Sequence, residues 1–360
     1  MPLPQPRFSD SNTSLGHRGL PFAAVTQPAA GRNPAAVANS RPETMAMRSA
    51  QTQSSFRDRI MPVEITRYTR VVTWLNVITN IGIVGTGGLV RLTGSGLGCS
   101  EWPYCTPESI FPTPELGIHG MIEFGNRTLT FVLVVVALLA FLAVVRTPKQ
   151  LGLRRIPLWI GILIIVQAVV GGITVWLELD PRIVGVHFLF SALLAALAGL
   201  QLARVQRAHE LPANLAITRD RGAWFAALVV TVLCWFTELV GVLTTGSGPH
   251  AGDELAARNG LDPVVMHHVH AWPGYALLIS IMVLRILVAR AKLDASQKLT
   301  DTLAVFVMMQ IGFGIYQART GLPIWSVAVH MVLAVTVLAL LSVLLVNLRR
   351  ELSRPTKVAE

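Results

Sequence analysis

Residues 156–177 read IPLWIGILIIVQAVVGGITVWL, a run without a charged side chain. A transmembrane helix needs roughly 20 apolar residues to cross the ~30 Å hydrocarbon core of a bilayer, and this run has that length. Comparable runs lie at 70–90, 121–145, 183–203, 223–244, 264–289, 299–318 and 323–347. The sequence therefore predicts an all-α integral membrane protein with eight transmembrane helices.

The composition agrees with a chain surrounded by membrane lipid. Of the 360 residues, 52% are hydrophobic and 14% are charged, whereas about 25% of the residues of a soluble protein are charged. The mean hydropathy is +0.55. These values exclude a water-soluble enzyme. The net charge of +10 does not indicate a nucleic-acid partner, because the basic residues lie in the tails and in the short segments between apolar runs.

The distribution of basic residues also predicts the orientation of the chain in the membrane. If the N-terminus is cytoplasmic, 25 of the 30 Lys and Arg residues fall on the cytoplasmic side. Positive charge is retained on that side of a membrane. We therefore expect a multi-pass protein of the plasma membrane with both termini in the cytoplasm. The basic residues expected on the opposite side are Arg91, Arg127, Arg182, Arg258 and Arg319.

The apolar pattern divides the chain into five regions. Residues 1–65 are rich in Pro, Ser, Ala and Gln and predict a disordered cytoplasmic tail. This tail lacks the pattern of a cleaved signal peptide, and Met61 is an alternative start. We expect an N-terminal four-helix bundle at 66–205, a cytoplasmic linker at 206–222, a C-terminal four-helix bundle at 223–348 and a cytoplasmic tail at 349–360.

The two predicted bundles resemble each other. Gln167 precedes His187 by twenty residues, and Gln310 precedes His330 by the same spacing, at an offset of 143. The sequence Thr-Gly-Ser-Gly occurs at 93–96 and again at 245–248. These matches predict two tandem pseudo-symmetric bundles related by an axis along the membrane normal. The alternative is chance similarity between apolar helices.

Histidines in the second repeat predict a haem site. Ionisable side chains inside a membrane are costly and commonly functional. His270 and His330 are expected at matched depth on helices of one bundle, and Gly312 and Gly314 leave room for a flat macrocycle. Two facing imidazoles can hold six-coordinate haem iron. The alternative is that each histidine only hydrogen-bonds a neighbouring helix.

The first repeat differs at one position. His187 has Asn126 where the second repeat has His270, and an amide is a poor ligand for haem iron. This predicts five-coordinate iron, or a haem bound as substrate with one open face. Glu123 lies one turn from Asn126 and is placed to move protons. The alternative is a buried ion pair with Arg127, which is itself a candidate for holding a haem propionate.

Cys99 and Cys105 flank five residues of the first loop on the non-cytoplasmic side. Two cysteines on the oxidising side of a membrane favour a disulfide, whereas a zinc site would need two further ligands. Closing so short a loop adds little stability, so a redox role is a further hypothesis. Cys234 lies in an apolar span and is expected to be inert.

Three motifs closely resemble the haem A synthase family in its actinobacterial form. They are GGLVRLTGSGLGCSEWPYC at 87–105, IEFGNR at 122–127 and GSGPHAGD at 246–253, and the resemblance covers about residues 65–350. It implies oxidation of the haem O methyl group to the formyl group of haem A, for an aa3-type terminal oxidase. It also implies haem b between His270 and His330, haem O near His187, and an important acidic residue at Glu123.

The sequence departs from the wider family in two places. Many relatives have His where this chain has Asn126, which puts bis-His ligation in the first repeat in doubt. The third loop on the non-cytoplasmic side has no cysteine pair, so thiol chemistry rests on Cys99 and Cys105. Our mechanistic hypothesis passes electrons from the first haem through the second to an acceptor, with quinone as the candidate. Haem O synthase and terminal oxidase assembly are the expected partners.

Two other functions are weighed against this interpretation. A membrane dihaem b-type electron carrier would use the same histidines without porphyrin chemistry, and its purified form would contain haem b alone. A transporter built from parallel repeats would place polar groups near the membrane midplane. The polar groups of this chain cluster instead toward the non-cytoplasmic ends of the spans, which disfavours transport.

Overall fold

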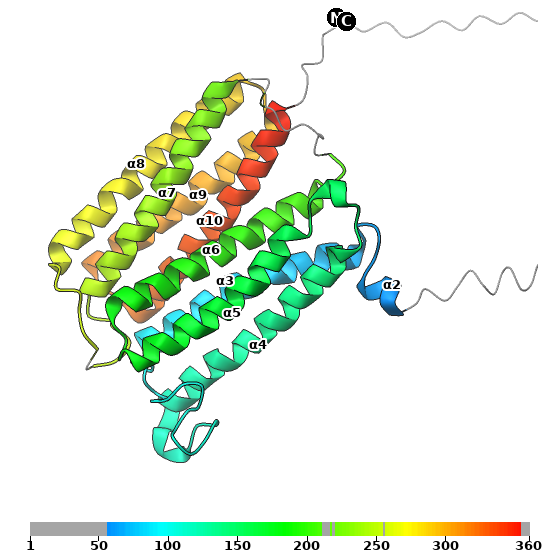
Figure 1. The fold of residues 1–360 in the computed structure, drawn as a ribbon. Helices are drawn as coiled ribbons and strands as arrows, with labels where there is room; N and C mark the ends of the chain where they lie inside the picture. Colours follow the sequence, from blue (N-terminus) through cyan, green and yellow to red (C-terminus); the bar gives the residue numbers. More distant parts are fainter. Residues whose placement is uncertain (1–55, 211–216, 218–219, 255, 354–360) are drawn as a thin grey trace, which may run out of the picture. The chain divides into compact units, whose positions relative to one another are not determined.

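Eight long helices account for most of the computed structural model, which describes residues 56–210, 217, 220–254 and 256–353 (Figure 1). Each is long and apolar enough to span a membrane, and the described residues contain no strand. The predicted all-α membrane architecture is confirmed. The eight helices are α3 Arg67–Leu92, α4 Gly117–Val145, α5 Arg155–Trp176, α6 Pro181–Gln206, α7 Arg221–Ser247, α8 Pro263–Arg290, α9 Asp294–Arg319 and α10 Ile324–Leu352.

Most helices extend beyond the predicted apolar runs. The clearest case is α9, which begins at Asp294, five residues before the expected start at 299. The hydropathy signal ends where the hydrocarbon ends, but backbone hydrogen bonding continues through polar residues outside it. Hydropathy therefore locates the membrane-spanning part of a helix more closely than its ends.

Asp-Pro pairs begin two of the helices that carry histidines. The side chain of Asp180 accepts a hydrogen bond from the Arg182 N–H at 2.8 Å, and Pro181 is the first residue of α6. Asp262 accepts from two N–H groups at the start of α8, where Pro263 comes first. Asp is a favoured N-cap and Pro suits the first helical position. These signals set the depth at which His187 and His270 lie.

The predicted disordered tail, residues 1–65, extends too far along the sequence, because its last part includes a helix. Phe56–Ile60 form the short helix α2, and Asp58 pairs with Arg146 at 2.7 Å. The partner of Asp58 lies 88 residues away in the sequence, so the local pattern of residues 56–60 did not reveal this contact. The predicted tail at 1–55, the linker residues 211–216 and 218–219, and the predicted tail at 354–360 lie outside the described residues.

The helices pack as two rings of four. In the N-terminal bundle, α3 contacts α4 and α6, and α5 contacts α4 and α6. In the C-terminal bundle, consecutive helices from α7 to α10 contact each other, and α10 returns to α7. The two bundles join through α10, which packs against α6 and α3, and through contact between α6 and α7 (Figure 1).

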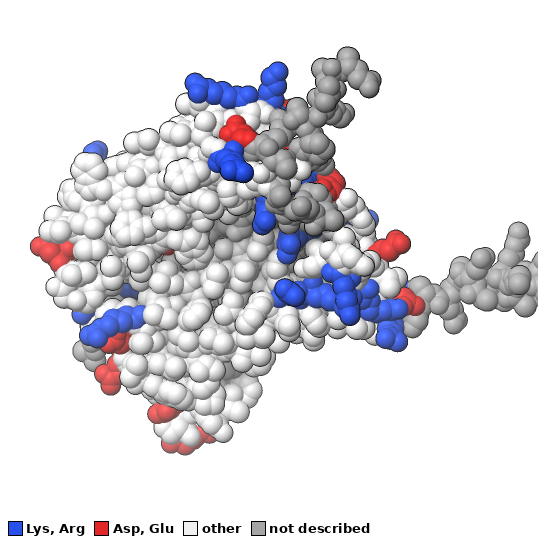
Figure 2. Space-filling model, turned by 45° about the horizontal axis from the view of Figure 1, so that its top comes forward, with Lys and Arg blue, Asp and Glu red and all other residues white. Residues whose placement is uncertain are grey.

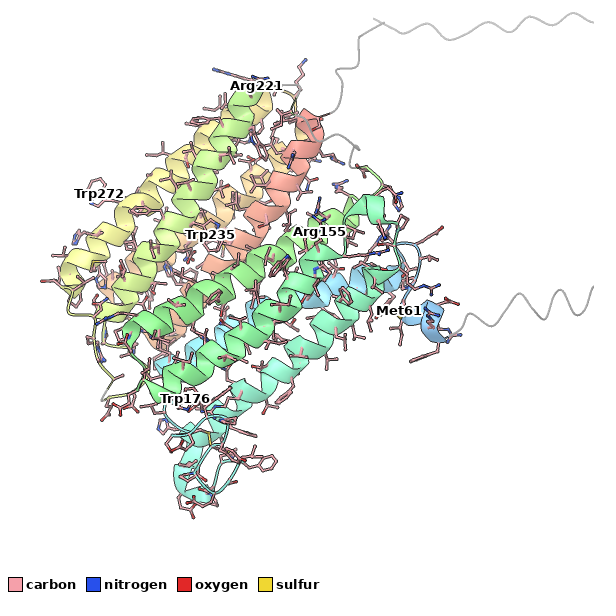
Figure 3. All side chains as sticks on the ribbon, in the orientation of Figure 1. Met61, Arg155, Trp176, Arg221, Trp235 and Trp272 are labelled. Atoms are coloured by element: carbon pink, nitrogen blue, oxygen red, sulfur yellow. A yellow bond between two sulfur atoms is a disulfide. The ribbon has the colours of Figure 1, made fainter. Side chains whose placement is uncertain are left out.

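Lipid-facing residues form the sides of the helix assembly. Large apolar side chains such as Phe131, Ile165 and Ile279 are more than 60% exposed, and Figure 2 shows a broad uncharged surface between charged groups at the ends. Arg155 and Arg221 begin their helices at one end, whereas Trp176 ends α5 at the other (Figure 3). We call the end that carries loops 93–116, 177–180, 248–262 and 320–323 the disulfide end. The chain is a multi-pass membrane protein.

A glycine allows a close contact between the bundles. A Cβ added at Gly199 of α6 would lie 2.4 Å from the carbonyl oxygen of Ala339 in α10. No real Cβ tolerates that distance to a backbone atom, so one helix would have to move. Small residues are the usual means by which membrane helices approach closely.

We expect Gly199→Ala to destabilise the protein by about 1–3 kcal/mol, the usual cost of overpacking a core. The control is Gly161→Ala, because a Cβ at Gly161 has no atom within 4 Å. Thermal unfolding of the purified variants in detergent, followed by circular dichroism, measures the difference. Equal melting temperatures for the two variants would contradict the close α6–α10 contact.

Candidate functional site

The rings of His270 and His330 lie next to each other, nearly perpendicular, in the C-terminal bundle. Their centroids are 6.2 Å apart and their planes are inclined by 79°. Glycines on the two remaining helices make room for them. A Cβ at Gly241 of α7 would lie 2.9 Å from His270 Cε1, and a Cβ at Gly314 of α9 would lie 3.4 Å from His330 Cε1. The structure therefore places the two predicted histidines side by side, and a glycine of a neighbouring helix lies next to Cε1 of each ring.

Unpaired ring nitrogens mark this site and its counterpart. Nδ1 of His187, His270 and His330 is buried and has no hydrogen-bond partner within the described part of the chain. Buried polar atoms in folded proteins nearly always have a partner. Other buried side-chain atoms, such as Gln167 Oε1 and Gln310 Oε1, also lack a partner among the described residues. The three imidazoles stand out because a histidine nitrogen, unlike an amide oxygen, is a common metal ligand.

The spacing of the C-terminal pair suits haem iron. Imidazole nitrogen binds a metal ion at about 2 Å, and the ring centroid lies roughly 1 Å behind the nitrogen. Two imidazoles on opposite sides of one iron would thus have centroids roughly 6 Å apart. The observed separation of 6.2 Å matches that requirement, so these residues fit a bis-His haem.

The N-terminal bundle repeats part of this arrangement. A Cβ at Gly171 of α5 would lie 3.1 Å from His187 Cε1. Gly314 has the corresponding position beside His330 in the C-terminal bundle. Gln167 fixes the helix that carries His187, since its Nε2 donates to the His187 carbonyl at 2.7 Å and to Ser191 Oγ at 2.6 Å.

Asn126 is turned toward α3. Its Oδ1 accepts a hydrogen bond from Thr86 Oγ1 at 2.8 Å, and a Cβ at Gly87 would lie 3.8 Å from its Nδ2. Among the described residues, no hydrogen bond or ring contact joins Asn126 to His187. Thr86 was missed in the sequence, where its only signal is a hydroxyl within an apolar span. The two bundles therefore differ at the position facing the histidine.

Glu123 and Arg127 form the buried ion pair that was the alternative to a free carboxylate. Glu123 is 5% exposed. Its Oε1 accepts from Nε of Arg127 at 3.1 Å and also from Nη2. Its Oε2 accepts from the Cys99 N–H at 2.7 Å. The carboxylate thus links α4 to the disulfide loop, residues 99–105.

Arg127 binds that loop through its remaining donors. Nη1 donates to the carbonyls of Glu101 and Tyr104, both at 2.9 Å, and Nη2 donates to the Cys99 carbonyl at 3.2 Å. With the two bonds to Glu123, these interactions use all five N–H donors of a guanidinium. A role for Arg127 in holding a propionate stays a prediction, and it would require breaking some of these bonds.

The disulfide loop also covers α5. Cys99 and Cys105 are bonded to each other, as the spacing predicted, and Cys234 is a buried free cysteine. The Trp102 ring lies directly on Gly172, where an added Cβ would be 2.4 Å away. Trp176 Nε1 donates to the Trp102 carbonyl at 3.2 Å. The loop therefore lies next to Gly171, which contacts His187.

We expect Arg127→Met to loosen the disulfide loop. Breaking a buried ion pair costs about 3–5 kcal/mol, and each 1.4 kcal/mol is tenfold in an equilibrium. Hydrogen exchange of the amides of residues 99–105, followed by mass spectrometry, should accelerate at least about tenfold. The matched control is Arg182→Met, because the Arg182 side chain is 87% exposed. Equal exchange in both variants would show that Arg127 does not hold the loop.

Comparison with known proteins supports a family assignment. The model of the COX15-CtaA family, described as cytochrome oxidase assembly protein, matches residues 70–342. Similar proteins include a Heme A synthase of Bacillus cereus (strain 03BB102), 25% identical over 59% of this chain and 74% of that protein. A Heme A synthase of Shewanella oneidensis is 23% identical over 72% of this chain and 91% of that protein. The chain therefore belongs to the COX15-CtaA family of cytochrome oxidase assembly proteins.

Proposed function

We propose that this chain is a haem A synthase, an enzyme that oxidises the methyl group of haem O to the formyl group of haem A for a terminal oxidase. The similar proteins of known name support the reaction. The observation that carries the proposal is the imidazole pair of His270 and His330, 6.2 Å apart with unpaired ring nitrogens.

The two bundles have different roles in this proposal. His270 and His330 hold haem b in the C-terminal bundle. His187 receives haem O in the N-terminal bundle, where Thr86 keeps the amide oxygen of Asn126 engaged. The bound haem iron supplies one-electron redox chemistry. A side chain that does not ligate iron leaves one face accessible, which suits a haem that arrives as substrate and leaves as product.

Glu123 is the proposed site of proton transfer. Arg127 binds its Oε1, so we assign the transfer to Oε2, which accepts the Cys99 N–H. The same bond makes the position of the carboxylate depend on the disulfide loop. Arg127 is then a positioning residue, because it holds both the carboxylate and the loop that bonds to it.

The orientation and the partners complete the proposal. The disulfide end faces away from the cytoplasm in the plasma membrane, which places Cys99 and Cys105 in an oxidising compartment and most basic residues on the opposite side. Haem O synthase is the proposed supplier of substrate, and a quinone is the proposed electron acceptor. The dihaem carrier is less well supported, because Asn126 gives the first bundle no second imidazole.

We expect His330→Ala to abolish the low-spin haem spectrum of the purified protein, since it removes one of the two imidazoles that would bind the iron. The control is His268→Ala, because His268 is exposed and its Nδ1 lies 2.9 Å from the Val264 carbonyl oxygen of its own helix. Absorption spectra of the oxidised and reduced forms distinguish the variants. A low-spin spectrum that persists without His330 would refute its role as a ligand.

We expect Glu123→Gln to bind haem b normally but to block conversion of haem O. Membranes that lack this protein should accumulate haem O, and the wild-type chain should restore haem A. Glu123→Gln should leave haem A formation reduced by about 10²-fold or more, the usual effect of removing a general acid or base. Pigments extracted from the membranes and separated by chromatography measure both haems.

Glu178→Gln provides the matched control, because Glu178 is exposed at the disulfide end. It should form haem A as the wild type does. Normal haem A formation by Glu123→Gln would remove Glu123 from the mechanism. Membranes that lack the protein and contain no haem O would contradict the proposed reaction itself.

A further inference from the structure

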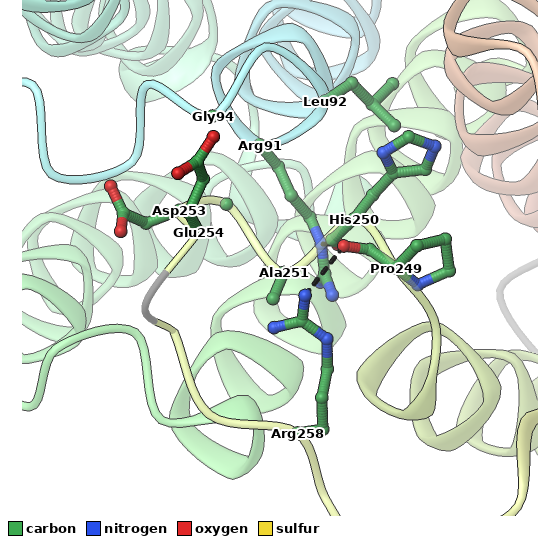
Figure 4. Close-up of a pocket in the computed structure, with 10 residues that line it drawn as sticks. Arg91, Leu92, Gly94, Pro249, His250, Ala251, Asp253, Glu254 and Arg258 are labelled. Atoms are coloured by element: carbon green, nitrogen blue, oxygen red, sulfur yellow. Dashed lines mark hydrogen bonds between the residues drawn. The ribbon is translucent and has the colours of Figure 1, made fainter.

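A cavity of about 340 Å³ lies at the disulfide end, where the two bundles meet (Figure 4). Arg91, near the end of α3, lines it from the N-terminal bundle. The loop between α7 and α8 lines it from the C-terminal bundle and contributes Arg258. The loops also bond to each other, since the Gly96 N–H donates to the Gly252 carbonyl at 2.8 Å.

The two arginines of this cavity point toward each other (Figure 4). Asp253 and Glu254 line the same cavity, and no ion pair joins Glu254 to either arginine among the residues that the structure describes. Like charges at close range are unfavourable. An anion between the two guanidinium groups would replace this repulsion with two attractive contacts.

Both guanidinium groups have donors left for a ligand. Arg91 donates from Nε to the His250 carbonyl at 2.6 Å and from Nη2 to the Thr245 carbonyl at 3.1 Å. Arg258 donates to the carbonyls of Ala256 and Pro249 at 2.5 and 2.8 Å. Each side chain thus makes two bonds with its five N–H donors. The carbonyls hold the arginines in place, and planar donor groups remain that match a carboxylate.

We propose that Arg91 and Arg258 bind a carboxylate, and that it is a propionate of the haem held by His270 and His330. This inference rests on the proposed function, because that function brings the haem. It names a ligand for a cavity that the mechanism above does not use.

The cavity adjoins α10, which carries His330. Its lining residue Gly252 also lies beside Leu179, just before α6, where an added Cβ would be 3.1 Å from Leu179 Cδ1. A Cβ at Gly88 of α3 would lie 3.3 Å from Met331 Sδ, and Met331 directly follows His330. Arg91 is three residues beyond Gly88, about 4.5 Å farther along α3 toward the disulfide end. The His250 ring at the cavity lies 3.1 Å from the Leu322 carbonyl, just before α10 begins. Both contacts connect the cavity to the helix that carries His330.

The other arginines at this end are less suitable. Arg127 uses all five donors within the protein. The side chain of Arg182 is 87% exposed, and Arg319 is exposed at the end of α9. Arg91 and Arg258 are therefore the basic residues of this end that line a cavity with donors available.

Two haems that differ only in their carboxylates test the proposal. The full-length chain, prepared without haem, is titrated with haem b and with haem b dimethyl ester, whose propionates are uncharged. We expect the wild type to bind haem b at least about tenfold more tightly than the ester, since a hydrogen bond to a charged group contributes about 1.5–3 kcal/mol. Equal affinities would overturn the proposal without any variant.

A variant then locates the carboxylate. Arg258→Gln should weaken haem b binding about tenfold and leave ester binding unchanged, and Arg258→Lys should restore part of the difference. Arg319→Gln is the matched control and should bind both haems as the wild type does. A loss of affinity that is equal for haem b and its ester would assign Arg258 a purely structural role and overturn the proposal.

A third measurement tests whether the cavity binds a haem propionate or another anion. Inorganic phosphate is titrated into the haem-loaded wild type and Arg258→Gln. We expect no saturable binding, because the propionate occupies the cavity. Phosphate binding that disappears in Arg258→Gln would assign the cavity to a free anion or a lipid phosphate instead. Failure of the proposed function is distinguishable, since it appears as a low-spin spectrum that does not depend on His330.

Discussion

A polar group inside a hydrocarbon layer must find its partner within the protein, because no water is there to supply one. This chain meets that requirement in most places. Asn76 Nδ2 donates to Gln201 Oε1 at 2.8 Å between α3 and α6, and Gln167 donates to the carbonyl of His187 at 2.7 Å. The imidazoles of His187, His270 and His330 are among the exceptions, since Nδ1 of each has no partner among the described residues; Gln167 Oε1 and Gln201 Nε2 are others. The imidazoles differ from these amides because each also has a glycine of a neighbouring helix against its ring.

The two bundles show how one arrangement of helices supports two kinds of site. Both place a glycine against a histidine, at Gly171 with His187 and at Gly314 with His330. The difference lies on the second and sixth spans, where Asn126 hydrogen-bonds Thr86 and His270 lies next to His330. A pair of strong ligands suits a haem that stays in the protein. A single imidazole suits a haem that reacts and leaves, as proposed for the N-terminal bundle, because weaker ligation allows exchange.

Hydropathy and the internal repeat were sufficient to predict the membrane helices and the neighbouring histidines. Both patterns act through side chains whose spacing is visible in the chain, and the cysteine spacing predicted the bond between Cys99 and Cys105 in the same way. The bonds of Arg127 to loop carbonyls were not predictable, because backbone acceptors carry no residue signature. The same reason applies to Arg91, which binds the carbonyl of His250 at 2.6 Å. The helix α2 was missed because a single ion pair between Asp58 and Arg146 produces no periodic pattern.

The loop at residues 99–105 is fixed to α4 by Arg127 and rests on α5 through Trp102 and Gly172. Because this loop is bound to two helices, it is poorly suited to move aside each time a porphyrin enters or leaves. The porphyrin of the proposed reaction has another approach, sideways from the bilayer between the helices. Lateral exchange would keep the porphyrin out of water throughout its transfer. It would also require the proteins that deliver and collect it to be embedded in the same membrane and to dock along the flank of this one.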